Sequence, residues 1–383
     1  MPGTAQFEER VRRRIRNLEE AGLRRSLQPP RGIDFSSNDY LGLANHPRLK
    51  ERMAGAVLAE GCGSTASRLL RGERAMLTEV ERRFASFKGC EASLYFGSGY
   101  AANLSVLTTF LERHDTVYTD SQNHASIVDG IRLSHAKRVK FRHCDIDDAA
   151  RRLRHAPDGS QRFLITESLF SMDGDFAPLA AYAELCRETG TVLIVDEAHA
   201  VGIYGQRGSG WIEQAGCSDE VLLSVDTAGK ALGVCGAFVS GPSWAIDYLV
   251  QRARPFMFST APPPAVAAAI NESLSVIEDE PHRRRSVRGL SAALRASLTE
   301  RGLNIGRSES QIIPILLGDN DRAQAVAAEL QSEGFDIRAI RPPAVAPGTA
   351  RLRVSVNAGL DEEILQRFAG AVQRVTQCSA VSS

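Results

Sequence analysis

Lys230 is the single cation in the largely apolar stretch VLLSVDTAGKALGVCGAFVS (residues 221–240). Burial of an ammonium group without a partner costs several kcal/mol, so we expect either a compensating charge nearby or conversion of the amine into an uncharged group. A phosphate-binding loop is excluded, because Ala231 follows the lysine where that motif needs Ser or Thr, and Ser224 stands in place of its first glycine. Condensation with an aldehyde cofactor remains, and pyridoxal phosphate (PLP) is the common cofactor of this kind.

PLP makes three further demands: a cradle for its phosphate, a carboxylate for its ring nitrogen and a group against its ring face. In LYFGSGYAANLSVL, a strand turns into a helix at GSGY, so the amides of Gly99 and Tyr100 would face a phosphate. Asp196 ends an apolar strand, where ligands collect in parallel sheets, and His199 faces the same edge. His124 follows another strand and could stack on the ring and handle a proton. Each group alone has an ordinary structural explanation, and their joint occurrence favours a PLP site.

Composition and charge exclude several other classes of function. Lys plus Arg and Asp plus Glu number 46 each, so no global field attracts nucleic acid or an anionic membrane. The apolar runs are of strand length, well short of the roughly 20 residues of a membrane span, and the N-terminus opens no signal peptide, which predicts a cytoplasmic protein. Seven scattered cysteines without a CxxC pair argue against a disulfide framework and a metal site, and predict reduced core thiols.

Strand-like and helix-like segments alternate along most of the chain, which predicts an α/β fold built on a largely parallel sheet covered on both faces. The predicted strands share short runs of apolar and β-branched residues: 116–119, 138–141, 162–167, 191–199, 221–225 and 236–240. Near residue 270 the pattern changes to longer amphipathic helices and three further strands, which indicates a smaller α+β domain. We expect an N-terminal helix and arm (1–45), a large PLP-binding domain (46–272) and a small C-terminal domain (273–383).

The N-terminal segment RVRRRIRNLEEAGLRR is rich in arginine but is not predicted to bind nucleic acid. Val11, Ile15 and Leu18 recur at helical spacing, and Glu19 and Glu20 interrupt the positive charge. This pattern favours an amphipathic helix that docks on protein and exposes a basic face.

Six motifs in order, SSNDYLGL, GSGYAAN, NHAS, ESLFSMDGD, VDEAHAVGIYGQRGSG and TAGKALG, resemble the α-oxoamine synthases. The match runs from about residue 34 to residue 356. These are PLP-dependent transferases of fold type I that join an amino acid to an acyl thioester. The resemblance implies a large domain with a mostly parallel seven-stranded sheet, a smaller C-terminal α+β domain, and a homodimer with active sites at the interface. The segment IRPPAVAPGTARLRVSV (340–356) is most similar to the biotin-pathway branch, which implies L-alanine and pimeloyl-CoA or pimeloyl-acyl carrier protein as substrates.

The resemblance also implies a role for each matching residue. The implied cofactor contacts are Lys230 as the imine-forming amine, Asp196 at the ring nitrogen, His124 stacked on the ring, Ser171 and His199 at the phenolic oxygen, Thr227 at the phosphate and Thr260 at the phosphate of the neighbouring subunit. The implied substrate contacts are Arg353 at the α-carboxylate, His124 at the thioester carbonyl, and Arg24, Asn38 and Arg341. Lys230, released from the cofactor, and His124 would move the protons.

The chain departs from the family pattern at two positions. Ala344 stands where a threonine usually lines the substrate site, so the preference for the acyl chain is left open, and Leu77 replaces a usual histidine. The rival interpretations are another member of the family, such as a glycine C-acetyltransferase or a long-chain acyl condensing enzyme, a plain aminotransferase, and a catalytically silent PLP-binding protein.

Overall fold

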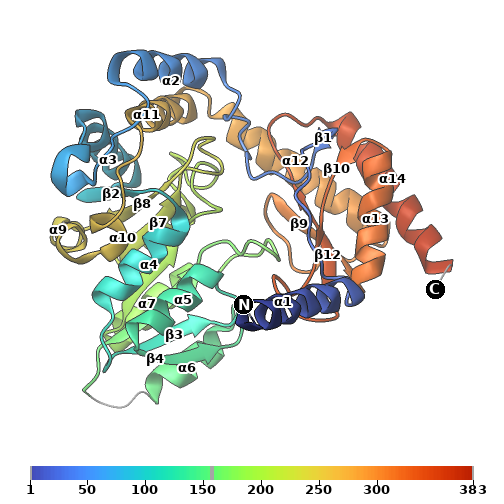
Figure 1. Cartoon of the computed structure of the whole chain (residues 1–383), viewed down its shortest axis with the longest axis horizontal. Helices are drawn as coiled ribbons and strands as arrows, with labels where there is room; N and C mark the ends of the chain where they lie inside the picture. The colour runs from blue at the N-terminus through green and yellow to red at the C-terminus, as the bar shows by residue number, and fades with distance from the viewer. Residues whose placement is uncertain (1, 156–158, 382–383) are drawn as a thin grey trace.

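A computed structural model of the chain describes residues 2–155 and 159–381, which form two lobes (Figure 1). The larger lobe is built on the predicted seven-stranded, mostly parallel sheet. Its strands, in spatial order, are β2 (Ala92–Phe96), β8 (Ala237–Gly241), β7 (Val221–Thr227), β6 (Val192–Asp196), β5 (Arg162–Glu167), β3 (Thr116–Asp120) and β4 (Lys137–Phe141). β8 runs antiparallel to both of its neighbours, and the other pairs are parallel. The fold class expected from the sequence is therefore confirmed.

Helices cover both faces of this sheet, which explains why most of its strands are buried almost throughout. The edge strand β4 is the exception, because its lysines and arginine are exposed. One face packs on α4 (Gly99–Phe110), α5 (Ala125–Ser134) and α9 (Ser243–Arg252). The other face packs on α3 (Ala75–Lys88), α6 (Ile146–Arg154), α7 (Leu179–Thr189) and α11 (Pro264–Asp279). Short helical segments complete the lobe: η1 (Arg68–Gly72), α8 (Trp211–Ala215) and α10 (Arg254–Met257).

The parallel strands bring several polar residues to one edge of the sheet. Asp120, Glu167, Asp196 and Thr227 are the last residues of β3, β5, β6 and β7. Glu167 lies directly beside Asp196 in the ladder between β5 and β6. This edge is where ligands bind in open α/β sheets.

The smaller lobe joins the C-terminal segment to the N-terminal arm. Its elements are β1 (Ile33–Asp34), α12 (His282–Glu300), β9 (Ile312–Gly318), α13 (Asn320–Ser332), β10 (Phe335–Asp336), β11 (Ala339–Ile340), β12 (Ala350–Ser355) and α14 (Glu362–Val381). β9, β12 and β11 form an antiparallel sheet, and β1 pairs in parallel with β10. Residue 272, the predicted end of the large domain, lies inside α11, which packs on α3 and on α2 (Pro47–Glu60). The domain boundaries stay a prediction.

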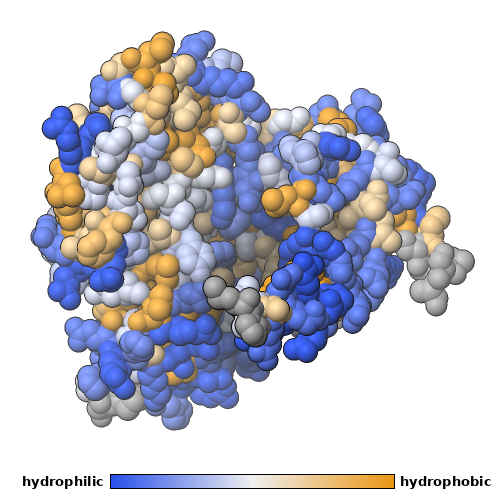
Figure 2. Space-filling model, in the orientation of Figure 1, coloured by the Kyte–Doolittle hydropathy of each residue, from blue (hydrophilic) through white to orange (hydrophobic). Residues whose placement is uncertain are grey.

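Figure 2 shows a hollow between the two lobes. The N-terminal segment forms α1 (Pro2–Glu20), as its periodicity predicts. The apolar stripe of α1 is nevertheless accessible: Val11, Ile15 and Leu18 are 37%, 42% and 44% exposed. Of the cysteines, Cys186 and Cys217 are buried core thiols as expected, whereas Cys62, Cys235 and Cys378 are exposed. No helix among the described residues is long and apolar enough to cross a membrane.

Candidate active site

Asp196, at the end of β6, lies 7% exposed and is held by two donors. The side-chain amide of Asn103 donates to Oδ2 over 2.7 Å, and the backbone N–H of Ala198 donates to Oδ1 over 2.9 Å. Asn103 comes from α4, whose N-terminus follows the GSGY turn. The carboxylate and this turn are thus positioned by the same helix.

Lys230 lies in the loop after β7 and begins a chain of polar contacts. Its Nζ is 2.7 Å from His199 Nε2, and His199 Nδ1 is 2.7 Å from the Tyr40 hydroxyl. Burial lowers the pKa of Lys230 to about 8, although the carboxylates of Asp196 and Glu167 oppose the shift. Burial also lowers the pKa of His199 well below its usual range, with the charge of Lys230 acting in the same direction. A neutral imidazole therefore orients an amine that is partly neutral at physiological pH.

Arg353 joins the same network from the smaller lobe. Its side chain on β12 is 8% exposed, and it donates from Nη2 to the Tyr40 hydroxyl over 3.2 Å and from Nη1 to Ser355 Oγ over 3.0 Å. Its Nε donates to the carbonyl oxygen of Ser171. Arg353, the predicted contact of the substrate α-carboxylate, is thereby connected through Tyr40 and His199 to the amine of Lys230.

His124 caps the N-terminus of α5 beside these groups. Its backbone N–H donates to Glu167 Oε1 over 2.6 Å, and Glu167 in turn donates its N–H to Asn123 Oδ1 over 3.0 Å. Burial, with the nearby Asp196, raises the pKa of Glu167 to about 8. The imidazole of His124 meets the ring of Tyr100 edge to face, with centroids 6.3 Å apart. Glu167 thus fixes the backbone that carries the predicted stacking histidine.

An anion cradle lies at the start of α4. Ser98 caps the helix by accepting the N–H of Ala101 over 3.2 Å, which leaves the amides of the first turn facing outward. A Cβ built on Gly97 or Gly99 meets no atom within 4 Å, so the turn borders open space. At the end of β7, Thr227 Oγ1 accepts the N–H of Gly229 over 3.2 Å.

Lys88 is a buried cation that contacts residues at the ends of β6 and β7. Lys88 Nζ donates to Glu197 Oε2 over 3.1 Å and to Asp226 Oδ1 over 2.8 Å. Glu197 follows Asp196 in the chain, and Asp226 precedes Thr227. Although burial opposes it, these two carboxylates raise the pKa of Lys88. A charged Lys88 therefore ties together the ends of the strands that carry two predicted cofactor contacts.

The remaining predicted residues differ in how they relate to this centre. Asn38 accepts the Tyr40 hydroxyl over 3.0 Å, so it belongs to the same network. Arg24 pairs with Glu19 on α1, and Arg341 donates to the carbonyl oxygens of Gly22 and Arg24. Ala344 lines a cavity of about 600 Å³ together with Ser171. Tyr100 donates its hydroxyl to Asp129, and Thr260 lies exposed on the surface.

Four residues of the site were not assigned from the sequence: Tyr40, Asn103, Glu167 and Lys88. Tyr40, Asn103 and Glu167 stand within the motifs SSNDYLGL, GSGYAAN and ESLFSMDGD, so the motifs themselves carried a signal. Lys88 is outside those motifs, and its partners lie more than 100 residues away in the chain.

The donor set fits PLP. A buried carboxylate with a fixed orientation, an amine of lowered pKa and an open glycine turn at a helix N-terminus supply the three groups that this cofactor needs. The residues that would hold it are Lys230, Asp196 and the amides of Gly99 and Tyr100, with Thr227, Ser171, His199 and His124 around them.

The lowered pKa of Lys230 predicts the pH dependence of its reaction with an aldehyde. Since the neutral amine reacts, borohydride trapping of PLP on Lys230 at short times should rise about tenfold from pH 7 to pH 9 and then level off. Mass spectrometry of the labelled peptide measures this rise. The exposed Lys137 is the internal reference for the extent of labelling. A Lys230 profile that climbs toward the ordinary value of 10.5 would contradict the lowered pKa.

Comparisons with known proteins match nearly the whole chain. A family model described as aminotransferase class I and II matches residues 30–372. The 8-amino-7-oxononanoate synthase of Anaeromyxobacter dehalogenans is 45% identical over 372 residues, which cover 94% of this chain and 93% of the relative. A solved serine palmitoyltransferase from S. paucimobilis, with bound PLP-myriocin aldimine, has a TM-score of 0.91 at 27% identity and covers 98% of this chain and 99% of its own. An 8-amino-7-oxononanoate synthase structure from Francisella tularensis has a TM-score of 0.78 at 28% identity, over 91% of this chain and 99% of its own.

Proposed function

The chain belongs to the aminotransferase class I and II family, and from this premise we propose that it works as an 8-amino-7-oxononanoate synthase. It is a PLP-dependent acyltransferase of the α-oxoamine synthase type, which condenses L-alanine with a pimeloyl thioester in biotin biosynthesis. The observation that carries the proposal is the 45% identity, over 94% of the chain, with a curated relative of that name. The geometry of the site supports it, because Lys230 is connected to Arg353 through the contacts of His199 and Tyr40.

PLP, when bound, supplies an electron-withdrawing ring that stabilises negative charge on the α-carbon of an amino acid. Asp196, held by Asn103 and Ala198, would keep the ring nitrogen protonated. His124 would hold the ring face, and the amides at the start of α4 with Thr227 would hold the phosphate. These contacts are part of the proposal.

Arg353 and Lys230 act on alanine. The guanidinium of Arg353, anchored by Ser355 and the carbonyl of Ser171, holds the α-carboxylate. With a pKa of about 8, Lys230 Nζ can take the α-proton of alanine near neutral pH, while His199 Nε2 keeps the amine oriented. The α-carbon of alanine then attacks the thioester carbonyl, to which His124 would donate a hydrogen bond, and the carbon–sulfur bond breaks. The sulfur leaves as a thiolate and takes up a proton from solvent. The alanine carboxylate leaves as CO2, and the proton held by Lys230 returns to the α-carbon in its place.

A second copy of the chain is part of the same proposal. Thr260 is exposed and lies beside a surface with accessible apolar side chains: Phe258 is 71% exposed and Leu70 is 81% exposed. The N–H of Ala261 donates to the carbonyl of Ala66, which joins the two segments. Burial of this surface in a homodimer would carry Thr260 to the phosphate site of the other subunit. We also propose a cytoplasmic location, because the relatives are enzymes of bacterial biosynthesis.

An assay of thioester and amino acid preference tests the proposed function. Purified protein with PLP is mixed with L-alanine and pimeloyl-CoA or pimeloyl-acyl carrier protein, and product is quantified by mass spectrometry. We expect pimeloyl thioesters to be used at least about tenfold better, by kcat/KM, than acetyl-CoA or palmitoyl-CoA. Glycine with acetyl-CoA, or any amino acid with a long acyl chain, as the preferred pair would assign the chain to another synthase. Accumulation of the pyridoxamine form would indicate an aminotransferase, and binding of PLP without any product would indicate a silent protein.

A further inference from the structure

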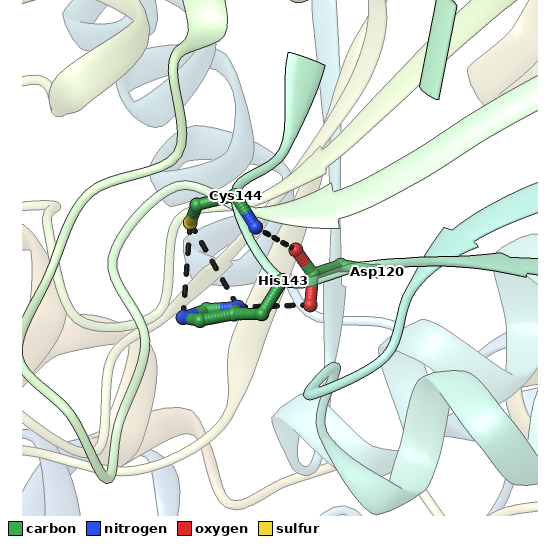
Figure 3. A group of neighbouring side chains, drawn as sticks. All are labelled: Asp120, His143 and Cys144. Atoms are coloured by element: carbon green, nitrogen blue, oxygen red, sulfur yellow. Dashed lines mark hydrogen bonds and ion pairs between the residues drawn. The ribbon is translucent and has the colours of Figure 1, made fainter. Parts of the chain in front are cut away.

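His143 lies between two carboxylates, those of Asp120 and Asp175, at the edge of the large sheet; Figure 3 shows the Asp120 side of this cluster. Its Nδ1 is 2.9 Å from Asp120 Oδ1, and its Nε2 is 3.0 Å from Asp175 Oδ2. Asp120 ends β3, whereas Asp175 belongs to the turn that follows β5 and closes through the bridge between Leu169 and Phe176. A single imidazole therefore connects two segments that are separate in the chain.

The cluster has the geometry of an imidazolium with a proton on each nitrogen. A carboxylate oxygen accepts hydrogen bonds, so each of the two contacts requires a donor on the ring. Although burial alone would lower it, the hydrogen bonds to Asp120 and Asp175 raise the pKa of His143 to about 12. The ring also meets Phe170 edge to face, with centroids 4.4 Å apart. The charge and orientation of His143 are thus fixed at physiological pH.

A metal site is the alternative interpretation of the same cluster. Ligand atoms of Asp120, His143 and Cys144 lie within 4.8 Å of one another (Figure 3). Both nitrogens of His143 already face carboxylates, and Asp120 Oδ2 accepts the backbone N–H of Cys144 over 2.8 Å. Burial raises the pKa of the Cys144 thiol, which disfavours the thiolate that a metal needs. The contacts favour an ionic clamp over a metal centre.

The two segments that His143 joins are two walls of one cavity. Residues 121–123, directly after Asp120, and residues 170–173, in the same turn as Asp175, both line the space of about 600 Å³ that Ala344 also borders. Residues 342–347, with Thr349 and Arg351 of the smaller lobe, form the third wall.

The cavity lies next to the predicted chemistry. Asn123 precedes His124, and Ser171 carries the carbonyl that accepts Arg353 Nε. The second wall is itself braced on the smaller lobe, since Arg351 Nη1 donates to Asp173 Oδ1 over 2.7 Å. The two carboxylate contacts of His143 are with Asp120 and Asp175, and not with Lys230 or Arg353. His143 therefore acts on the two cavity walls.

We propose that His143 is a positioning residue for the acyl thioester: by clamping Asp120 to Asp175 it fixes the separation of two walls of the cavity that receives the acyl chain. This inference rests on the proposed function, since it takes the acyl thioester as the occupant. The two carboxylate hydrogen bonds of His143 are made to Asp120 and Asp175, and not to the predicted cofactor contacts or to Arg353. Its loss should therefore affect the thioester and leave alanine and PLP nearly unchanged.

Steady-state kinetics of His143→Gln test the clamp, because glutamine is neutral and cannot donate to both carboxylates at once. We expect the KM for the pimeloyl thioester to rise about tenfold while kcat falls less than about threefold. PLP affinity, from fluorescence quenching, and alanine affinity, from the absorbance of the loaded protein, should stay within about twofold of the wild type. The exposed His114→Gln is the matched control and should leave all four quantities unchanged.

Asp175→Asn provides a second variant in case His143→Gln fails to fold, since it keeps the Asp120 contact and removes one charge. We expect a smaller rise in the same KM, with melting temperature used to confirm folding. Equal effects on the affinities for PLP, alanine and thioester would overturn the positioning role and indicate a general structural one. If the wild type is active and both variants keep its KM for the thioester, the positioning role would also be overturned. If the wild type itself forms no product, the proposed function is refuted instead.

Two direct measurements separate the clamp from the metal site. In protein labelled with nitrogen-15 histidine, His143 should show two protonated ring nitrogens at pH 8, where an ordinary histidine shows one. Elemental analysis of the purified holoprotein should find no stoichiometric transition metal. A bound metal at one equivalent, lost in His143→Gln, would overturn the proposal in favour of the metal site.

Discussion

Lys230→Ala should lower product formation by at least about 1,000-fold and abolish covalent capture of PLP after borohydride treatment. The loss is large because one amine has two functions: it is the attachment point of the cofactor and the base that takes the α-proton of alanine. No other lysine contacts this network among the residues that the structure describes, since Lys88 is committed to Glu197 and Asp226 on the far side of the strand ends.

The control for this variant is Lys137→Ala, at an exposed lysine of β4. It should keep full activity and full labelling of residue 230. Mass spectrometry of the trapped peptide and a steady-state assay are run on both variants, with circular dichroism to confirm the fold. A Lys230→Ala protein that still forms product within tenfold of the wild-type rate would refute the anchor and the base together.

Local chemistry was sufficient to single out Lys230 and Asp196 in the sequence as candidate site residues. Asp196 and Lys230 stand out because a charged residue at the end of, or just after, an apolar strand is unusual unless a ligand compensates it. The six predicted strands all formed, because runs of apolar and β-branched residues favour extended strands regardless of distant partners.

The parts that could not be predicted depend on contacts between distant segments. Tyr40 lies 159 positions from His199 and 313 positions from Arg353, so no local pattern shows that the three meet. Lys88 looks like an ordinary lysine near the end of an amphipathic helix, and only the fold shows that it is buried against two carboxylates. The stripe of α1 indicated a docked helix, and periodicity alone could not show that its apolar side chains stay accessible.

Asp196→Asn should lower kcat by about 100- to 1,000-fold, the usual cost of removing one preorganised electrostatic contact from an active site. The amide has the size of the carboxylate but carries no charge, so it cannot keep the ring nitrogen of PLP protonated. Asn103 and the N–H of Ala198 both donate to Asp196, and one of these donors would then face an amide NH2 group instead of an acceptor. Stopped-flow and steady-state assays with saturating PLP measure the loss in the chemical step.

The exposed Asp219→Asn is the control and should leave kcat unchanged. A second readout separates lost chemistry from lost folding. Since the negative charge of Asp196 helps to raise the pKa of Glu167, its removal should lower that pKa from about 8 toward the ordinary carboxyl range, which carbon-13 NMR of labelled glutamate can follow in the protein without PLP. A variant with normal kcat would show that the ring nitrogen needs no carboxylate partner here. An unchanged Glu167 titration would show that the two carboxyl groups at the ends of β5 and β6 do not interact as their adjacency in the ladder requires.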